Sequence, residues 1–166
     1  STDAHEIDPH ISDWRGRWKG STPVLVKPAT TEEVSAAMTL CAEYGLAVNP
    51  QGGNSGMVNG SVPQGEVLIS LKRMNKVREV DVLNDAMTLE AGVILTRAQE
   101  IAEEHDRLFP LSLGAQGVAM VGGLISTNAG GVQVLRYGMM RDLVLGIEAV
   151  LPDGRVWNGL RGLRKD

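Results

Sequence analysis

The pattern of hydrophobic and polar positions is clearest between residues 30 and 45, where it predicts a helix. Four apolar residues recur at positions i, i+3, i+4 and i+7, which is the spacing of one buried helical face. They are Val34, Ala37, Met38 and Cys41. Thr30 with Glu33 matches a capping box at the start of this helix, and Gly45 supplies a cap at its end. Cys41 is therefore expected to pack in the core and not to act as a nucleophile.

Shorter apolar runs bounded by turn residues predict the strands. They are expected at residues 24–26, 47–49, 66–71, 77–82, 87–90, 146–151 and 155–157. The middle pair is expected to turn at Asn84-Asp85 and the last pair at Pro152-Asp153-Gly154. A second helix is expected from about Leu95 to His105. Because strands and helices mix without a regular strand–helix–strand repeat, the predicted fold class is α+β.

The first stretch of the chain, up to residue 22, carries no such period and predicts an extended arm. Trp14 and Trp18 lie four positions apart in it. They are expected to anchor the arm on the core, and a ligand site is the alternative.

Composition narrows the classes of function. Of 166 residues, 43% are hydrophobic and 22% are charged, which is typical of a globular protein. The net charge of -4 argues against nucleic acid or an anionic membrane as the main partner, because both attract clustered Lys and Arg. One cysteine and three scattered histidines offer neither a disulfide framework nor a zinc site. With no apolar run long enough to span a membrane and no signal segment at the start, the expected location is cytoplasmic.

Glycine stands out at 20 of 166 residues, against an ordinary share of roughly 7%, and it gathers in two segments. The first segment runs from Pro50 to Gly60, directly after an expected strand. Glycine allows positive φ and lets successive backbone N–H groups converge on an anion, so this segment is expected to cradle a phosphate. A long surface turn is the alternative. It is not a P-loop, which would need Gly-Lys-Ser/Thr, and it is not a Rossmann loop, because it does not open a helix.

The second segment runs from Gly114 to Gly131 within an otherwise apolar stretch, so some group is expected to approach its backbone closely. Tight helix packing at Gly122 and Gly123 is the alternative. Two such segments in one acidic chain favour a diphosphate that is bound by both of them.

Both segments resemble those of a known family. Pro50-Gln-Gly-Gly-Asn-Ser-Gly-Met-Val-Asn-Gly is similar to the first pyrophosphate loop of the vanillyl-alcohol-oxidase-type flavoproteins, the PCMH-type FAD-binding domain. Gly122-Gly-Leu-Ile-Ser-Thr-Asn-Ala-Gly-Gly is similar to the second FAD loop of that family. The stretches that begin at Leu135, Leu145 and Leu163 resemble the branch of D-2-hydroxyglutarate dehydrogenases, D-lactate dehydrogenases and the flavoprotein component of glycolate oxidase. The resemblance covers residues 18–166 and implies two α/β subdomains with FAD between them.

The resemblance also implies which residues bind the cofactor. In the first segment they are Pro50, Gln51, Gly52, Gly53, Asn54, Ser55, Gly56 and Met57. In the second they are Leu113, Gly114, Gly117, Gly122, Gly123, Ser126, Asn128 and Ala129, with Tyr137 and Gly138 beside the flavin. Members with covalent flavin carry a His in the first loop, where this chain has Asn54, so the FAD is expected to be non-covalent. Arg136 is expected either to help bind an anionic substrate or to be structural.

The same resemblance divides the chain into an arm (1–22), a first FAD subdomain (23–84) and an incomplete second FAD subdomain (85–166). The chain is expected to be truncated at its C-terminus and to lack the family's substrate domain, which carries the substrate-binding arginine and lysine and a His/Glu metal site. No catalytic residue and no metal ligand is therefore expected in this chain.

The implied function is the FAD-binding portion of a flavin-dependent D-2-hydroxy-acid dehydrogenase. Such an enzyme passes hydride from the substrate α-carbon to flavin N5 and its electrons to a separate acceptor, with a base from the missing domain. The chain alone is expected to be inactive, to bind no nucleic acid, to have no transmembrane segment and to be able to form a homo-oligomer. The alternatives are another flavin oxidoreductase of the same fold and a non-catalytic nucleotide-binding or interaction fragment.

Overall fold

The computed structural model describes residues 1–160, in two compact units. Among these residues the first unit comprises Ser1–Arg73 and 145–160, and the second comprises Met74–Val144. These bounds differ from the expected divisions after residues 22 and 84, because the N-terminal segment and residues 145–160 both pack into the first unit. The Leu163-Arg-Lys-Asp stretch lies outside the described residues.

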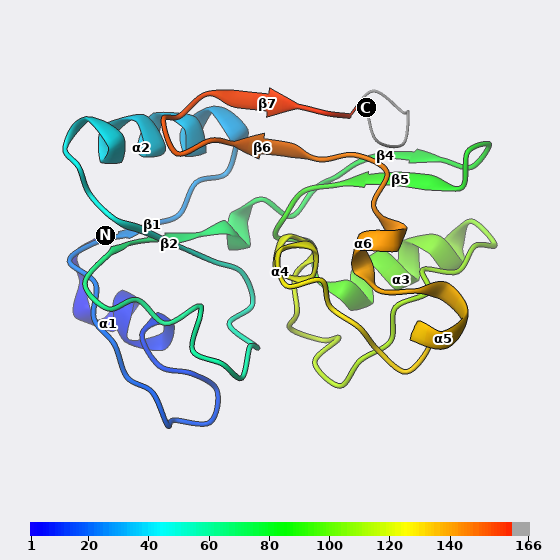
Figure 1. The fold of residues 1–166 in the computed structure, drawn as a ribbon, viewed down its shortest axis with the longest axis horizontal. Coiled ribbons are helices and arrows are strands. Elements are labelled where there is room, and N and C mark those ends of the chain that lie inside the picture. The colour runs from blue at the N-terminus through cyan, green and yellow to red at the C-terminus, as the bar shows by residue number, and fades with distance from the viewer. Residues whose placement is uncertain (161–166) are drawn as a thin grey trace. The chain divides into compact units, whose positions relative to one another are not determined.

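The first unit is built on a three-stranded parallel sheet (Figure 1). Its strands are β1 (Leu25–Val26), β3 (Val67–Ser70) and β2 (Val48–Gln51), in that order across the sheet. Helix α2 (Thr31–Glu43) joins β1 to β2, as a crossover between parallel strands requires. The three strands are confirmed to within a few residues, but the β1–α2–β2 unit is an arrangement that the sequence pattern did not suggest.

Helix α2 begins and ends as its sequence predicts. The Thr30 hydroxyl oxygen accepts a hydrogen bond from the Glu33 N–H (3.2 Å), and the Glu33 carboxylate accepts one from the Ala29 N–H (2.7 Å). Gly45 follows the helix at φ +62°, the left-handed conformation that ends a helix most easily at glycine. Cys41 is buried against β3, so its predicted packing role is confirmed.

Both faces of the parallel sheet are covered, as parallel sheets generally require. Val67 and Ile69 face α2, whereas Leu68, on the opposite face, packs with Leu25 and Ile7. Ile7 belongs to a short helical segment, α1 (Ala4–Ile7) followed by the 3-10 turn η1 (Asp8–His10). The predicted extended arm is therefore wrong, because the second face of the sheet needs an apolar cover and the N-terminal segment provides it.

The two tryptophans of this segment do not anchor it. Trp14 is 61% exposed and Trp18 is 52% exposed, so the expected anchoring on the core is wrong. The segment is fixed instead by polar contacts: the Asp13 carboxylate accepts hydrogen bonds from the N–H groups of Arg17 (2.7 Å) and Trp18 (2.8 Å). These backbone donors, that of Trp18 first, lower the pKa of Asp13 below its ordinary value.

A hairpin near the end of the chain completes the first unit. Strands β6 (Glu148–Val150) and β7 (Val156–Asn158) pair antiparallel, which confirms the predicted hairpin. It packs on α2, where Thr31 donates to the Glu148 carboxylate (2.7 Å) and Ser35 donates to the Gly154 carbonyl (2.6 Å). These contacts explain why residues 145–160 belong to the first unit.

The second unit has an antiparallel hairpin and four helices among the described residues (Figure 1). They are β4 (Val77–Asp81), β5 (Ala86–Leu89), α3 (Leu95–Glu104), α4 (Val121–Ser126), α5 (Val134–Tyr137) and α6 (Met140–Leu143). The predicted β4–β5 pair and the helix α3 are confirmed. The core of the unit is made of Val93, Leu95, Ala98, Leu111, Ala119, Val121, Leu124 and Met140.

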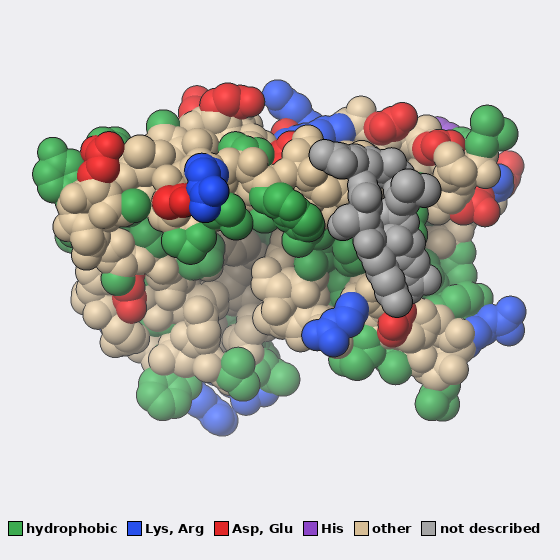
Figure 2. Space-filling view, turned by 45° about the horizontal axis from the view of Figure 1, so that its top comes forward, with side chains coloured by type: hydrophobic (Ala, Val, Ile, Leu, Met, Phe, Trp, Pro, Cys, Tyr) green, Lys and Arg blue, Asp and Glu red, His purple; other side chains and the backbone are tan. Residues whose placement is uncertain are grey.

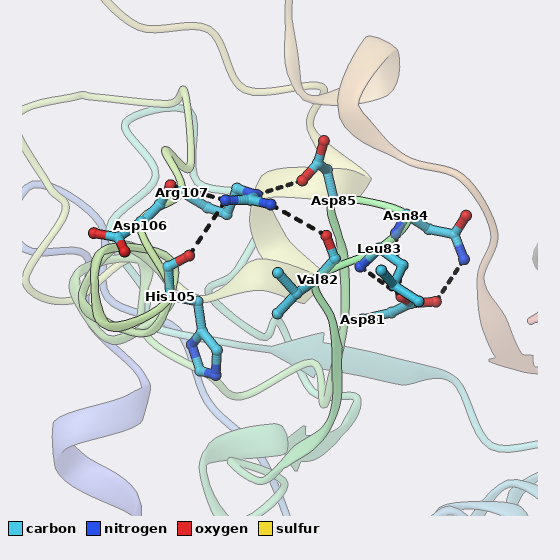
Figure 3. A network of polar contacts seen from close by, with 8 residues as sticks. All are labelled: Asp81, Val82, Leu83, Asn84, Asp85, His105, Asp106 and Arg107. Carbon is cyan, nitrogen blue, oxygen red and sulfur yellow. Dashed lines mark hydrogen bonds and ion pairs between the residues drawn. The ribbon is translucent and has the colours of Figure 1, made fainter.

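The tip of the β4–β5 hairpin is tied to the end of α3 by one arginine (Figure 3). Arg107 forms an ion pair with Asp85 and donates to the Val82 carbonyl (3.3 Å). Within the turn, the Asp81 carboxylate accepts from the N–H groups of Leu83 and Asn84 (both 3.1 Å). The turn is thus closed by Asp81 and held to the helix by Arg107.

Figure 2 shows the charged side chains of one face as small scattered groups of both signs, separated by hydrophobic and uncharged polar surface. No continuous basic patch is visible among the described residues on that face. No helix within residues 1–160 is long and apolar enough to cross a membrane.

Candidate functional site

The first glycine-rich segment forms a loop, residues 52–60, that leaves the sheet at the end of β2, and residues 61–66 then lead to β3. In parallel sheets the carboxyl ends of the strands are the usual place for a ligand. Pro50 and Gln51 are the last residues of β2, and the other six predicted residues of this segment lie in the loop. Pro50 is on an edge strand, where its missing N–H is tolerated.

The backbone donors of this loop are free. Among the described residues, no N–H from Gly52 to Gly60 donates a hydrogen bond to another residue. Backbone N–H groups that lack a protein partner must be satisfied by water or by a ligand. The loop is half-buried to exposed, so a run of donors is available to an anionic ligand.

The shape of the loop also leaves space beside its backbone. A Cβ atom placed on Gly56 or Gly60 would meet no heavy atom within 4 Å. Asn54 (φ +51°) and Asn59 (φ +63°) both have the left-handed conformation, which turns the chain twice within six residues. The Asn59 Oδ1 atom is buried and has no hydrogen-bond partner in the described part of the chain.

The base of the loop, in contrast, is firmly closed by side chains. Gln51 is only 1% exposed, and its amide nitrogen donates to the Ser61 carbonyl (2.7 Å) and to the His10 carbonyl (2.8 Å). Asn54 donates to the Ser12 carbonyl (2.7 Å) and accepts from the Ser61 hydroxyl (2.6 Å). The side chains of Gln51 and Asn54 are therefore used to hold the loop, and are not free to bind a ligand.

The N-terminal segment supplies two of these four contacts, those of His10 and Ser12, and sequence reasoning missed them. His10 is 7% exposed, and its Nδ1 atom lies 2.6 Å from the Gln51 Oε1 atom. Arg15 donates to the sulfur of Met57 (2.8 Å) near the tip of the loop. The contacting residues lie some 40 positions apart in the chain, so no local pattern could have revealed them.

The second segment is built differently. Gly122 lies in α4 and donates to the Ala91 carbonyl (2.8 Å); a Cβ atom on Gly122 would lie 2.7 Å from the Ala91 Cβ. A Cβ atom on Gly131 would collide with the Ser112 carbonyl. Tight packing thus explains the glycine at Gly122 and Gly131. Of the two glycines for which helix packing was the alternative interpretation, Gly122 fits it and Gly123 does not.

Other glycines of the second segment are open. A Cβ atom on Gly114, Gly117 or Gly123 would meet no heavy atom within 4 Å, and all three residues are exposed. The Gly123 N–H makes no hydrogen bond to another residue among positions 1–160. These three glycines are therefore the positions of this segment that can approach a ligand.

The remaining predicted residues of the second unit are largely engaged within it. Ser126 donates to the Gly122 carbonyl (2.7 Å), and the Asn128 side chain accepts from the Arg141 N–H (2.9 Å). Leu113 and Ala129 pack against the core of the unit. Tyr137 ends α5, with the Arg136 guanidinium 5.3 Å from the centre of its ring, and Gly138 follows at φ +79°.

These observations fit a cofactor that carries a diphosphate. The free N–H groups of residues 52–60, within the first unit, are suitable donors to phosphate oxygens, and the open glycines Gly56 and Gly60 admit a ligand close to the backbone. Within the described residues, no group of three or more His, Cys, Asp or Glu side chains could hold a metal ion.

A loop of free amides after a parallel strand is typical of the class of nucleotide-phosphate-binding domains. Within this class, residues 22–159 match the model of the FAD binding domain family, so the chain belongs to that family. The family resemblance expected from the sequence and the identity of the cofactor, FAD, are confirmed.

Two curated relatives are similar over nearly the whole chain. The D-2-hydroxyglutarate dehydrogenase of Bos taurus is 46% identical over 99% of this chain and 30% of its own length. The enzyme of the same name from Danio rerio is 48% identical over 99% of this chain and 31% of its own length. The chain therefore spans about a third of the length of the relatives it matches.

Both relatives are named as mitochondrial, which contradicts the expected cytoplasmic location. That expectation rested on the absence of a long apolar run and of a signal segment at the start of the chain. The first residue of a chain does not show what precedes it.

The fold has close counterparts among solved structures. An alkyldihydroxyacetonephosphate synthase superposes with a TM-score of 0.86 at 24% identity, over 99% of this chain and 32% of its own. The likeness confirms the expected fold class, a mixed helix and strand FAD-binding fold.

Proposed function

We propose that this chain is the FAD-binding portion of a flavin-dependent D-2-hydroxy-acid dehydrogenase. The observation that carries the proposal is the run of free N–H groups from Gly52 to Gly60, in a chain that belongs to the FAD binding domain family. The names of the relatives, D-2-hydroxyglutarate dehydrogenases, support the choice of substrate class.

In this proposal the chain's residues bind the cofactor mainly through the backbone. The loop of residues 52–60 donates to the diphosphate, and the second segment contributes through Gly114, Gly117 and Gly123. Gln51, Asn54, Ser126 and Asn128 contribute by holding the backbone in place, because their side chains are already engaged. Bound FAD supplies an acceptor of two electrons, which can be passed on one at a time.

The FAD is held without a covalent bond in this proposal. Residues 50–60 contain no His, Cys or Tyr that could be attached to the flavin ring. The Asn54 side chain is fixed by Ser12 and Ser61. Precipitating the flavin-loaded protein with acid should release all of the yellow colour into the supernatant, and colour that remains in the pellet would contradict this part of the proposal.

The partners follow from the same proposal: a small 2-hydroxy acid as substrate and a separate carrier as electron acceptor. Reduction of the flavin in the full-length protein by D-2-hydroxyglutarate or D-lactate, followed by its spectrum, tests the substrate class. Self-association into a homo-oligomer belongs to the proposal too, and light scattering on the purified chain tests it.

The binding step is tested by titrating the purified chain with FAD and following flavin fluorescence. Gly56→Ala should weaken binding about tenfold, since a new Cβ atom crowds the diphosphate, and such a change corresponds to about 1.4 kcal/mol. Val58→Ala is the matched control in the same loop, because Val58 is 88% exposed and its truncation leaves every backbone donor in place. A chain that leaves flavin fluorescence unchanged at any FAD concentration would contradict the proposal.

A further inference from the structure

A buried polar cluster joins the N-terminal segment to the base of the loop of residues 52–60. It consists of His10, Gln51 and Ser61, and no family resemblance drew attention to His10. His10 comes from η1 and Gln51 from the end of β2, and both side chains are more than nine-tenths buried. Buried polar groups are costly unless every one of them is paired, so this cluster depends on the orientation of each member.

The orientation of the Gln51 amide follows from its partners. Its nitrogen lies 2.7 Å from the Ser61 carbonyl oxygen and 2.8 Å from the His10 carbonyl oxygen, and carbonyl oxygens can only accept. The NH2 group must therefore point to these two carbonyls, which leaves Oε1 as the atom that faces His10 Nδ1, 2.6 Å away. Since Oε1 can only accept, Nδ1 carries the proton.

The His10 N–H therefore determines which way the Gln51 amide points. Without it, Oε1 would be a buried acceptor with no partner. Rotating the amide to find another partner would take the NH2 group away from the Ser61 carbonyl. Ser61 is the residue at which the loop rejoins the fold, and its hydroxyl also holds Asn54. The chain of contacts thus runs from His10 through Gln51 to both ends of the loop.

We propose that His10 is a positioning residue for FAD: its Nδ1–H fixes the Gln51 amide, and the amide holds the loop with its free N–H groups turned to the diphosphate. This inference rests on the proposed function, since it names what the loop binds. Within the described chain no N–H from Gly52 to Gly60 donates a hydrogen bond, and at the end of the loop the Asn59 carbonyl accepts from the Val62 N–H (3.2 Å). The conformation of the loop therefore depends largely on the side-chain contacts at its base.

Two substitutions at His10 separate the hydrogen bond from the bulk of the ring. His10→Asn keeps an N–H donor at about the position of Nδ1, whereas His10→Leu keeps an apolar side chain of similar reach and removes the donor. Ile7→Ala is the matched control, because Ile7 packs the same N-terminal segment on Leu25 and Leu68 but makes no contact in the polar cluster. Gln51→Met, which removes the amide itself, replaces His10→Leu if the latter fails to fold.

Two measurements are made on each variant of the chain. The first is the dissociation constant for FAD, followed by flavin fluorescence, and the second is the 15N order parameter of the amides of residues 52–60 without FAD. His10→Leu should raise the dissociation constant about tenfold or more and lower the order parameters, as expected for loss of a buried hydrogen bond. His10→Asn should restore both, and Ile7→Ala should leave both near the wild-type values.

Wild-type affinity in His10→Leu would overturn the inference. So would an equal loss in Ile7→Ala, because the effect would then come from general loosening of the segment. A wild-type chain that does not bind FAD contradicts the proposed function instead. In that case the order parameters still decide whether His10 positions the loop: unchanged values in His10→Leu overturn the inference, and lowered values support its structural part.

Discussion

The two glycine-rich segments hold their backbones in opposite ways. In the loop of residues 52–60 no N–H donates to another described residue, and the conformation is held by side chains at the base of the loop. In the second segment the backbone bonds to itself and to its neighbours: Gly122 donates to the Ala91 carbonyl, and Ala129 donates to the Leu124 carbonyl (2.9 Å). The first segment therefore presents free N–H donors above a base that side chains hold together. The second segment contains a packed helix, and only a few of its positions are open.

The difference shows that glycine serves two separate purposes in one chain. At Gly131 the absent side chain lets the backbone approach Ser112, which is a requirement of folding. At Gly56 and Gly123 nothing in the structure occupies the space of a side chain, so the requirement for glycine there would come from the ligand. Substitution by alanine distinguishes the two purposes, because it should affect stability in one group and FAD affinity in the other.

The largest effect is expected at the packed glycines. Gly131→Ala should destabilise the protein by about 1–3 kcal/mol, because its Cβ atom would collide with backbone that is itself hydrogen-bonded: the Ser112 carbonyl accepts from the Val132 N–H (2.9 Å). Urea unfolding followed by circular dichroism measures the change. Gly123→Ala is the control in the same segment and should retain wild-type stability or gain slightly, since alanine favours a helix. Equal losses of stability in Gly131→Ala and Gly123→Ala would contradict the distinction between packed and open glycines.

A smaller effect, on affinity only, is expected at the open glycines. Gly123→Ala should weaken FAD binding by about 1.4 kcal/mol, or tenfold, because the new Cβ atom stands beside a free N–H that the proposal assigns to the ligand. Flavin fluorescence titration gives the dissociation constant. Unchanged affinity would restrict the binding role of the second segment to its other open glycines, Gly114 and Gly117.

Much of the scaffold could be predicted because its signals are local. The capping box at Thr30 and Glu33, the stripe that includes Cys41 and the turn before β7 all depend on residues within about one helical turn or hairpin. Both candidate segments were found for the same reason, since glycine clusters are visible in the sequence itself. The side-chain roles of Gln51 and Asn54 were not, because a sequence does not show whether an amide is free or already bonded.

The N-terminal segment was misinterpreted because its role depends on distant partners. Ile7 is buried only because Leu68 of β3 lies opposite it, and His10 is buried only because it bonds to Gln51. A short helix without a full apolar period gives no signal of its own. Trp14 and Trp18 were expected to anchor the segment on the core because of their residue type and their spacing of four positions, and their exposure shows how weak those signals are without a partner.

Acid should weaken the first unit through the base of its loop. Burial, reinforced by Lys72 and Lys27, lowers the pKa of His10 below its ordinary value despite the bond to Gln51. As pH falls below about 6.5, the unfolded chain therefore takes up a proton at His10 before the folded chain does, and stability declines until the lower folded pKa is passed. Tryptophan fluorescence reports on this unit selectively, because Trp14, Trp18 and Trp157 all belong to it.

The measurement is the urea midpoint between pH of about 7 and 5, above the range in which carboxylates titrate. Wild type should lose stability over this interval, and His10→Asn should flatten the dependence because asparagine does not take up a proton. If the urea midpoint of His10→Asn still falls with pH, another titratable group causes the acid sensitivity. The base of the loop would then be no more sensitive to acid than the second segment.

The smallest effect on stability is expected at Arg107, the side chain that holds the β4–β5 hairpin of the second unit. Arg107 ties the β4–β5 tip to the end of α3 through Asp85 and the Val82 carbonyl, but both charged partners are largely exposed (Figure 3). Exposed ion pairs contribute little because water and salt screen them, so a double-mutant cycle of Arg107→Ala and Asp85→Ala should give a coupling energy of about 0.2–1 kcal/mol. The coupling should shrink further in 1 M salt, where the screening length is about 3 Å. A larger, salt-independent coupling would show that a surface contact can fix a hairpin as firmly as the buried His10–Gln51 contact fixes the loop.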